Sequence, residues 1–418
     1  MGNKVTLEVG YSQDHVKVEI DEDRLAGVYY PNMVEVGDEG ETIRTALANP
    51  VDSPTFAEFL SGGGKVLVIV NDGTRPTPTA KVLDEIGEDL EAVNPDYIVA
   101  TGVHRAPTED ELDFIFGSWK ERVRDRLHIH DSRDDSVMVP LGKSRAGTEM
   151  YVNRLGVDAD KIVIIGSVEP HYFAGFTGGR KAFLPGIAAY KTIEQNHQYA
   201  LRPESHSLAL DGNPVHDDMI DALTEVVSKP IFSIQTVLDR DRMLYAVTAG
   251  HIHGSFDAAI DAANEVFCVN IPQREDIVLS VAPYPMEIDL YQSQKCLDNG
   301  KLALNDDGIL IAVMPCRTGI GEESFFNLLS GQDTPQQVLD EIDKGFKLGY
   351  HKAAKMAEIM CRAHIWAISN LPDEKLSAIF ITPKSSIQQA VDEALAARPN
   401  GKVVFLAEGS ITVPNITG

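Results

Sequence analysis

Lys65-Val66-Leu67-Val68-Ile69-Val70-Asn71 is a run of branched apolar residues that ends at a polar side chain. Two similar runs follow, at Tyr97–Thr101 and Lys161–Ser167, and each precedes a loop and a helical pattern. Continuous apolar runs of this length are typical of strands buried on both faces, and their alternation with helices predicts a mostly parallel α/β sheet. Ligands of such sheets bind outside the carboxyl ends of the strands. We therefore expect the loops after these three runs to line one crevice.

The rest of the chain continues this alternation. A hairpin is expected over Phe232–Asp239 and Met243–Ala249, followed by a helix at Ser255–Val266. Further strands are expected at residues 277–282, 309–315, 364–369, 378–382 and 402–406, and helices at 290–304, 334–344, 352–362 and 386–397.

The 418 residues exceed the size at which one hydrophobic core keeps growing. We predict two α/β domains with mostly parallel sheets and an active-site cleft between them. Residues 1–270 are expected to form an N-terminal cofactor-binding domain, to which the tail 409–418 is a candidate to return. Residues 271–408 are expected to form a C-terminal domain that contributes substrate-binding residues.

The composition narrows the class of partner. The formal charge of −26 would repel nucleic acids and anionic membranes, so neither is expected as a partner. The four cysteines lack the spacing of a disulfide scaffold or of a zinc site, and no signal peptide or long apolar segment is visible. These features predict a cytoplasmic protein with reduced thiols.

The loop after the first strand combines an acid, a glycine, hydroxyls and an arginine in Asp72-Gly73-Thr74-Arg75. The next helix is expected to begin near Ala80, where free backbone amides attract anions. Gly73 permits a close backbone approach, and Arg75 is suited to a phosphate or carboxylate. The alternative is a proline-rigidified turn with capping side chains.

The loop after the second strand carries His104. An imidazole titrates near neutrality, which suits a general base, and this position faces the expected crevice. A solvated bystander is the alternative. The following helix is expected to begin with a capping box formed by Thr108 and Glu111.

The loop after the third strand, Val168–Gly186, is the most unusual stretch. Glycines and a proline surround the adjacent cations Arg180 and Lys181, among four aromatic side chains. A flexible backbone beside Lys181 suggests that a ligand docks there, and solvated loops rarely contain so many aromatic residues. We expect the chemistry to centre on the segment from His171 to His197, with Lys181 in the middle.

Several other side chains are weaker candidates. The pairs His128/His130 and His251/His253 have a spacing that can hold a metal, although no third ligand is evident. Gln292 and Lys295 are expected on one face of a helix, where they could bind a carboxylate. A solvated amphipathic helix is the alternative for this second pair.

Together these motifs, in this order, resemble the lactate racemase family of nickel-pincer-nucleotide enzymes. The segments that carry the resemblance are Asp72-Gly73-Thr74-Arg75-Pro76, Thr101-Gly102-Val103-His104-Arg105, Glu169–Gly186, Asn196-His197 and the pair Gln292/Lys295.

The resemblance implies a cofactor and a set of roles. The cofactor would be a pyridinium-3-thioamide-5-thiocarboxylic acid mononucleotide that carries nickel, attached covalently through Lys181, with His197 as the protein's metal ligand. Sulfur donors with an imidazole suit Ni(II), and a cofactor that brings most ligands explains the lack of a protein ligand cluster. Asp72, Gly73, Thr74 and Arg75 would bind the cofactor. Arg75, Gln292 and Lys295 would bind substrate.

The resemblance also implies the reaction. A 2-hydroxy acid would lose its hydroxyl proton to one histidine while its C2 hydride moves to the cofactor, and return of the hydride to the other face would invert the centre. His104 and His171 would be the two acid/base residues. Cofactor-synthesis enzymes would be needed for maturation, and which 2-hydroxy acid is the substrate stays open.

Two other functions are compatible with parts of the sequence. The chain could be a non-catalytic carrier of the nickel nucleotide, although a carrier needs no acid/base pair. It could also be a conventional metal-dependent sugar-acid isomerase or dehydratase that uses the His128/His130 or His251/His253 pair.

Overall fold

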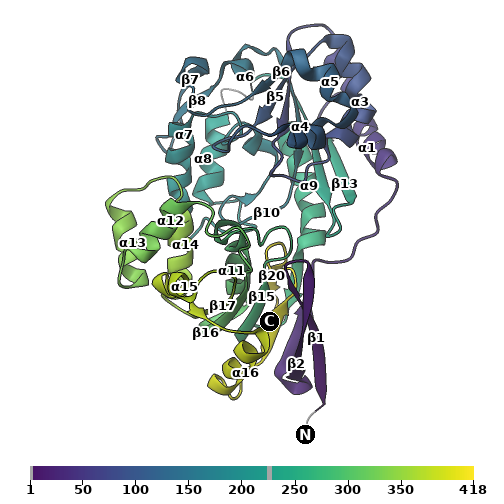
Figure 1. Ribbon diagram of the computed structural model, residues 1–418. Helices are drawn as coiled ribbons and strands as arrows, with labels where there is room; N and C mark the ends of the chain where they lie inside the picture. The colour runs from purple at the N-terminus through teal and green to yellow at the C-terminus, as the bar shows by residue number, and fades with distance from the viewer. Residues whose placement is uncertain (1–2, 224–227) are drawn as a thin grey trace. The chain divides into compact units, whose positions relative to one another are not determined.

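The computed structural model describes residues 3–223 and 228–418. The chain forms two compact units, one of residues 33–266 and the other of residues 1–32 with 267–418. Each has its own six-stranded sheet (Figure 1). None of the helices formed by the described residues has the length and hydropathy needed to span a membrane.

The sheet of the unit 33–266 has the order β13-β12-β9-β4-β5-β6, and every neighbouring pair except β12 and β13 is parallel. The strands are β4 (Val66–Asn71), β5 (Asp96–Ala100), β6 (Leu127–Ile129), β9 (Lys161–Ser167), β12 (Ile231–Leu238) and β13 (Leu244–Gly250). The three predicted parallel strands and the antiparallel hairpin are therefore confirmed.

Helices and two small hairpins complete this unit. The helices are α1 (Glu39–Ala48), α2 (Phe56–Leu60), α3 (Thr79–Val93), α4 (Glu109–Phe116), α5 (Lys120–Val123), α6 (Arg154–Asp158), α7 (Tyr190–His197), α8 (Pro214–Leu223) and α9 (Ile252–Phe267). The hairpins pair β7 (Met138–Lys143) with β8 (Glu149–Asn153), and β10 (Pro170–His171) with β11 (Gly175–Phe176).

Side chains that alternate between the two faces of β4 explain how a helical layer covers one face of this sheet. Val66, Val68 and Val70 are buried on one face, in a core cluster shared with apolar residues of α1, α2 and α3. On α3, Val82 and Ile86 are four residues apart and belong to the same cluster. Burial of each such side chain contributes roughly 1.5–3 kcal/mol, so this face anchors β4 and the loop that follows it.

The strand order reverses at the centre of this sheet. From β4 the chain moves to β5 and β6 on one side, then returns to β9 and β12 on the other. The loops that leave β4 and β9 therefore diverge at a topological switch point, where open α/β sheets bind ligands. The first and third loops singled out in the sequence are these two.

The second unit is also built on a parallel sheet, with the order β18-β17-β16-β15-β19-β3. Its strands are β3 (Leu25–Tyr29), β15 (Glu275–Val281), β16 (Leu304–Val313), β17 (His364–Ile368), β18 (Thr382–Pro383) and β19 (Val403–Leu406), with a hairpin of β1 (Lys4–Tyr11) and β2 (Asp14–Asp21) and a pair formed by β14 (Cys268–Ile271) and β20 (Val413–Ile416). Its helices are α10 (Leu290–Ser293), α11 (Lys295–Gly300), α12 (Glu323–Ser330), α13 (Pro335–Lys344), α14 (Tyr350–Met360), α15 (Asp373–Ala378) and α16 (Ile387–Ala397).

The division of the chain differs from the prediction at both ends. Residues 1–32 were assigned to the N-terminal domain, but β3 pairs in parallel with β19 and so belongs to the unit that contains residues 267–418. The C-terminal tail does cross to another strand, because β20 pairs with β14. That strand, however, lies in the same unit as the tail.

Two further local predictions were wrong. The strand expected at residues 378–382 is instead the end of α15 and a turn in which Phe380 has a φ of 64°, before the two-residue strand β18. A short apolar run fits a helix end as well as a strand. The helix α12 was not predicted, and the helix expected at 290–304 is shorter and divided into α10, α11 and a 3-10 turn.

Candidate active site

The loop after β4 is organised around a buried carboxylate. Asp72 is 6% exposed, and its Oδ1 accepts hydrogen bonds from the amide (3.1 Å) and the hydroxyl (2.6 Å) of Thr74. A Cβ atom on Gly73 would lie 2.8 Å from the Glu111 side chain, so packing already requires this glycine. Local structure therefore explains why the motif Asp72-Gly73-Thr74-Arg75 has an acid at its first position and a glycine at its second.

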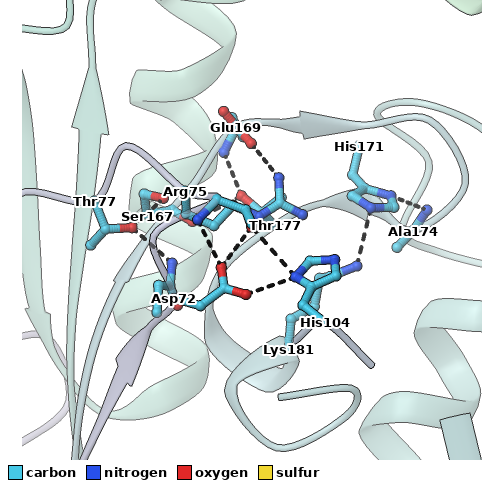
Figure 2. A network of polar contacts seen from close by, with 12 residues as sticks. Asp72, Arg75, Thr77, His104, Ser167, Glu169, His171, Ala174, Thr177 and Lys181 are labelled. Atoms are coloured by element: carbon cyan, nitrogen blue, oxygen red, sulfur yellow. Dashed lines mark hydrogen bonds and ion pairs between the residues drawn. The ribbon is translucent and has the colours of Figure 1, made fainter. Parts of the chain in front are cut away.

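Asp72 also fixes the protonation of His104. Its Oδ2 lies 2.7 Å from His104 Nδ1 (Figure 2). Burial alone would raise the pKa of Asp72, but the hydrogen bonds with His104 and Thr74 and the charge of nearby Arg75 hold its pKa below the usual range. An ionised carboxylate only accepts, so Nδ1 carries the proton. A neutral His104 ring therefore presents a lone pair at Nε2, as a general base requires.

Two contacts join the loops that leave β4 and β9. Arg75 Nη1 donates to Glu169 Oε1 at 2.8 Å, and Thr77 Oγ1 donates to Ser167 Oγ at 2.9 Å (Figure 2). Both members of the Arg75–Glu169 pair are about one-quarter exposed, at 26% and 25%. The predicted anion-binding arginine is therefore held by a carboxylate at the switch point.

The glycine-rich segment is closely packed against its neighbours. A Cβ on Gly175, which has a φ of 74°, would lie 2.1 Å from the carbonyl oxygen of Ala209, and one on Gly178 would lie 2.5 Å from Gln235 Oε1. These glycines beside Lys181 therefore allow close packing of the backbone against its neighbours. The aromatic prediction held, since Phe173, Phe176 and Phe183 are buried.

Lys181 and His171 face each other in this segment. Lys181 lies in the 3-10 turn Gly179–Ala182, with Nζ 3.3 Å from His171 Nε2 and 5.5 Å from the centre of the Phe173 ring (Figure 2). The amide of Ala174 donates to His171 Nδ1 at 3.3 Å. The hairpin of β10 and β11 thus positions the imidazole directly over the lysine.

Charge and burial both act on Lys181. Burial lowers its pKa well below the ordinary lysine range, and the cations Arg75 and Arg180 lower it further, against an opposing effect of Glu169. Arg180 is 1% exposed, donates to the carbonyl oxygen of Ala174 at 2.6 Å and lies 4.5 Å from the centre of the Phe256 ring. Among the described residues no carboxylate forms an ion pair with either Arg180 or Lys181.

His197 lies at the C-terminal end of α7, and a buried network sets its tautomer. Asn196 Nδ2 donates to Asp218 Oδ2 (2.8 Å) and to the carbonyl oxygen of Val215 (3.2 Å), which turns Asn196 Oδ1 toward His197 Nδ1 at 3.2 Å. Nδ1 is then the donor, and Nε2 has the lone pair that a metal needs. His197 also packs against Phe173, with ring centres 5.1 Å apart.

Among the described residues, neither of the two other histidine pairs belongs to a group of three or more possible metal ligands. His128 is exposed beside Asp96, whereas His130 is buried and its Nε2 lies 3.0 Å from the carbonyl oxygen of Ala188. Burial lowers the pKa of His130. In the ranges 3–223 and 228–418 there is no group of three or more His, Cys, Asp or Glu side chains that could hold a metal ion. A metal bound through His197 would thus need ligands from a bound group.

Gln292 and Lys295 lie in the other compact unit. Gln292 is in α10 and Lys295 begins α11, and both are half-buried. Asp289 caps α10 by accepting a hydrogen bond from the amide of Gln292 at 2.7 Å. Each residue is helical, but the two belong to consecutive helices and not to one helix as expected.

Two residues of the site were not singled out in the sequence. Glu169 holds Arg75, and Asp218 accepts hydrogen bonds from Asn196 and from the hydroxyl of Thr148 (2.8 Å). The burial of Asp218 could have been predicted from the sequence, because it lies on the apolar face of α8, three residues after Val215. No pattern in the sequence marked Glu169, since an acid in a loop is ordinary.

Comparison with known proteins identifies the family of the chain. The family described as Lactate racemase N-terminal domain matches residues 11–208, and that described as Lactate racemase C-terminal domain matches residues 271–413. The lactate racemase of Thermoanaerobacterium thermosaccharolyticum is 30% identical, covering 97% of this chain and 98% of that protein. The lactate racemase of Lactiplantibacillus plantarum is 29% identical with the same coverage.

Solved structures give the same result. The lactate racemase apoprotein from T. thermosaccharolyticum superposes with a TM-score of 0.91 at 28% identity, covering 98% of this chain and all of that chain. A protein from Thermotoga maritima shares the fold, with a TM-score of 0.67 at 16% identity over 92% of this chain and all of that one. From its sequence and its fold, the chain belongs to the lactate racemase family.

Proposed function

We propose that this chain is an isomerase that racemises or epimerises a 2-hydroxy acid, with lactate as the first substrate to test. The observation that carries the proposal is the complementary protonation of two histidines at the switch point. His104 presents a lone pair at Nε2 because Asp72 accepts from its Nδ1, whereas His171 accepts at Nδ1 and so carries its proton at Nε2. One ring can therefore accept a proton at Nε2, while the other can donate a hydrogen bond from Nε2.

A racemase needs two groups that can each gain and lose a proton, and two imidazoles are suited to this. One group must take the hydroxyl proton as the 2-hydroxy acid becomes a 2-keto acid, and a second must return a proton when the opposite enantiomer forms. A residue set with only one such group would serve a single enantiomer. A non-catalytic carrier would need neither, which favours the enzyme over the carrier.

The same residues fit the cofactor that the family resemblance implies. We propose that Lys181 is the attachment point and His197 the protein's metal ligand of a nickel-pincer nucleotide. His197 supplies a single imidazole donor, oriented through Asn196, and Lys181 supplies a partly buried amine. When bound, the group supplies the nickel and the acceptor for the C2 hydride, which soft sulfur donors and an imidazole suit.

Substrate binding is assigned on charge. Arg75 is the cation at the switch point and is suited to bind the substrate carboxylate. On binding, the substrate carboxylate would replace Glu169 as the partner of Arg75. The proposal that Gln292 and Lys295 also bind this carboxylate rests on the family resemblance. Asp72 acts as a positioning residue for His104, and Gly73 and Thr74 support that loop where it would approach the nucleotide.

Racemisation with isotopic labelling tests the proposed function. The chain is produced together with the cofactor-synthesis enzymes and incubated with L-lactate or D-lactate labelled with deuterium at C2, followed by chiral separation and mass spectrometry. The proposal predicts interconversion with retention of deuterium at C2. Washout of the label into solvent would point to proton abstraction at C2 and contradict hydride transfer. A panel of other 2-hydroxy acids then defines the substrate.

A further inference from the structure

The hydrogen bonds of His171 determine the charge of Lys181. His171 Nδ1 accepts from the Ala174 amide, so Nδ1 has no proton and the proton of a neutral ring is at Nε2. Nε2 is the atom that faces Lys181 Nζ at 3.3 Å, and it is therefore the donor of that contact (Figure 2). An ammonium group has three donors and no acceptor. Lys181 Nζ can accept this hydrogen bond only as an uncharged amine.

The groups around Lys181 support the uncharged form. Arg180 on the same turn and Arg75 from the loop after β4 oppose a third positive charge, and burial acts in the same direction. Glu169 is the acidic group that acts in the opposite sense, and its carboxylate is engaged by Arg75 at 2.8 Å. The ring of Phe173 faces Nζ from β10–β11 and offers no formal charge.

We propose that Lys181 and His171 form an uncharged pair before any cofactor is attached, with His171 as the donor, so that Lys181 is a nucleophile at neutral pH. This inference rests on the proposed attachment at Lys181 and adds the residue that prepares it. In attachment to a thiocarboxylic acid, a bond forms between Nζ and the thiocarboxyl carbon, and the carbon–oxygen bond breaks. The oxygen leaves as water with one proton from the amine and one from the acid, which leaves a thioamide and consumes no oxidant or reductant.

Attachment then changes the state of His171. The nitrogen lone pair of a thioamide is delocalised, so Nζ no longer accepts a hydrogen bond after the reaction. His171 Nε2 loses this partner and becomes available to the substrate hydroxyl. The same contact therefore holds the lysine reactive in the cofactor-free chain and releases the acid/base group once the cofactor is in place.

Competitive acetylation of the full cofactor-free chain tests the proposal. Brief treatment with acetic anhydride over a pH series from about 6 to about 11, which spans the ordinary lysine pKa of about 10.4, is followed by complete labelling with the deuterated reagent and peptide mass spectrometry. The exposed Lys402 is the internal standard. The proposal predicts that the labelling midpoint of Lys181 lies well below that of Lys402.

Matched variants separate the donor from a merely structural effect. His171→Gln keeps an N–H donor on the side chain and should keep the low midpoint, whereas His171→Leu removes the donor and should raise it. Arg75→Gln removes a neighbouring positive charge and should raise the midpoint, whereas Glu169→Gln removes a negative charge and should lower it further. Circular dichroism and the reactivity of Lys402 in each sample report whether the variant is folded.

The outcomes for this proposal and for the attachment itself are distinct. If Lys181 in the wild-type chain titrates together with Lys402, the uncharged pair is refuted, even if a cofactor adduct later forms on Lys181. If Lys181 titrates low and responds to the variants as described, the uncharged pair stands, even if no adduct forms after co-production with the cofactor-synthesis enzymes. Absence of an adduct on Lys181 would overturn only the proposed attachment site.

Discussion

Replacing Asp72 with asparagine tests the role of the buried carboxylate in the most specific way. The asparagine oxygen can still accept from Thr74, as Oδ1 of Asp72 does. The amide nitrogen, however, replaces the Oδ2 atom that lies 2.7 Å from His104 Nδ1. Because two donors cannot face each other, His104 Nδ1 must give up its proton, and the ring proton moves to Nε2. The base at Nε2 is lost.

The size of the effect follows from the lost hydrogen bond. A hydrogen bond to a charged group contributes about 1.5–3 kcal/mol, and about 1.4 kcal/mol corresponds to a factor of ten in a population. The fraction of Asp72→Asn enzyme with a lone pair at His104 Nε2 should therefore fall by about 10- to 100-fold, and kcat with it. KM should change little, because Asp72 touches His104 and not the substrate.

Chiral chromatography of lactate, started from each enantiomer, measures this loss in protein of known nickel content. The equilibrium constant of a racemisation is one, so kcat/KM should fall equally in both directions. Thr74→Val is the comparison variant, because it removes a hydroxyl from the same carboxylate and leaves the contact between Asp72 Oδ2 and His104 Nδ1. An Asp72→Asn enzyme with full nickel content and unchanged kcat would show that Asp72 does not set the tautomer of a catalytic His104.

The same substitution also has a pH signature in stability. The pKa of Asp72 is lower in the folded protein than in the unfolded chain, so its ionisation stabilises the fold above the unfolded pKa of about 3.9. That contribution is lost as the pH falls through the folded pKa. Urea unfolding should give a difference in stability between wild type and Asp72→Asn that is constant above about pH 5 and narrows below about pH 4.

Three further predictions concern neighbouring side chains. Glu169→Gln should lower KM about 2- to 5-fold, because it frees Arg75 from a partly exposed ion pair of about 0.5–1 kcal/mol. Steady-state kinetics measures this change, and a raised KM would disprove the prediction. Asp218→Ala should reduce the unfolding free energy by about 1–3 kcal/mol, since it leaves Asn196 Nδ2 buried with one fewer acceptor, and urea unfolding with no change would refute it. His197→Ala should lose nickel but keep the cofactor mass, a result that elemental analysis and intact mass can separate.

The parts of the fold that were predictable are those with a continuous local signal. The run at residues 161–167 matches β9 residue for residue, because a strand buried on both faces requires apolar side chains at successive positions. The partner of β3 was not predictable in this way. Its pairing with β19 joins residues near 25 to residues near 403, and no local pattern records such a distant neighbour.

The candidate site shows the same division. The positions of Asp72, His104 and Lys181 at strand ends followed from the alternation of strands and loops. Their protonation did not, because it depends on individual contacts such as that between the Ala174 amide and His171 Nδ1. The role of the glycines beside Lys181 also depends on packing, because they permit close contacts with neighbouring residues.

The attachment of the cofactor is tested by intact-protein mass spectrometry with nickel analysis, on chain produced together with the cofactor-synthesis enzymes. We expect a cofactor adduct that peptide mapping places on Lys181, stoichiometric nickel, and loss of the adduct in Lys181→Ala. Racemase activity in wild-type protein that carries neither an adduct on Lys181 nor nickel would contradict this expectation.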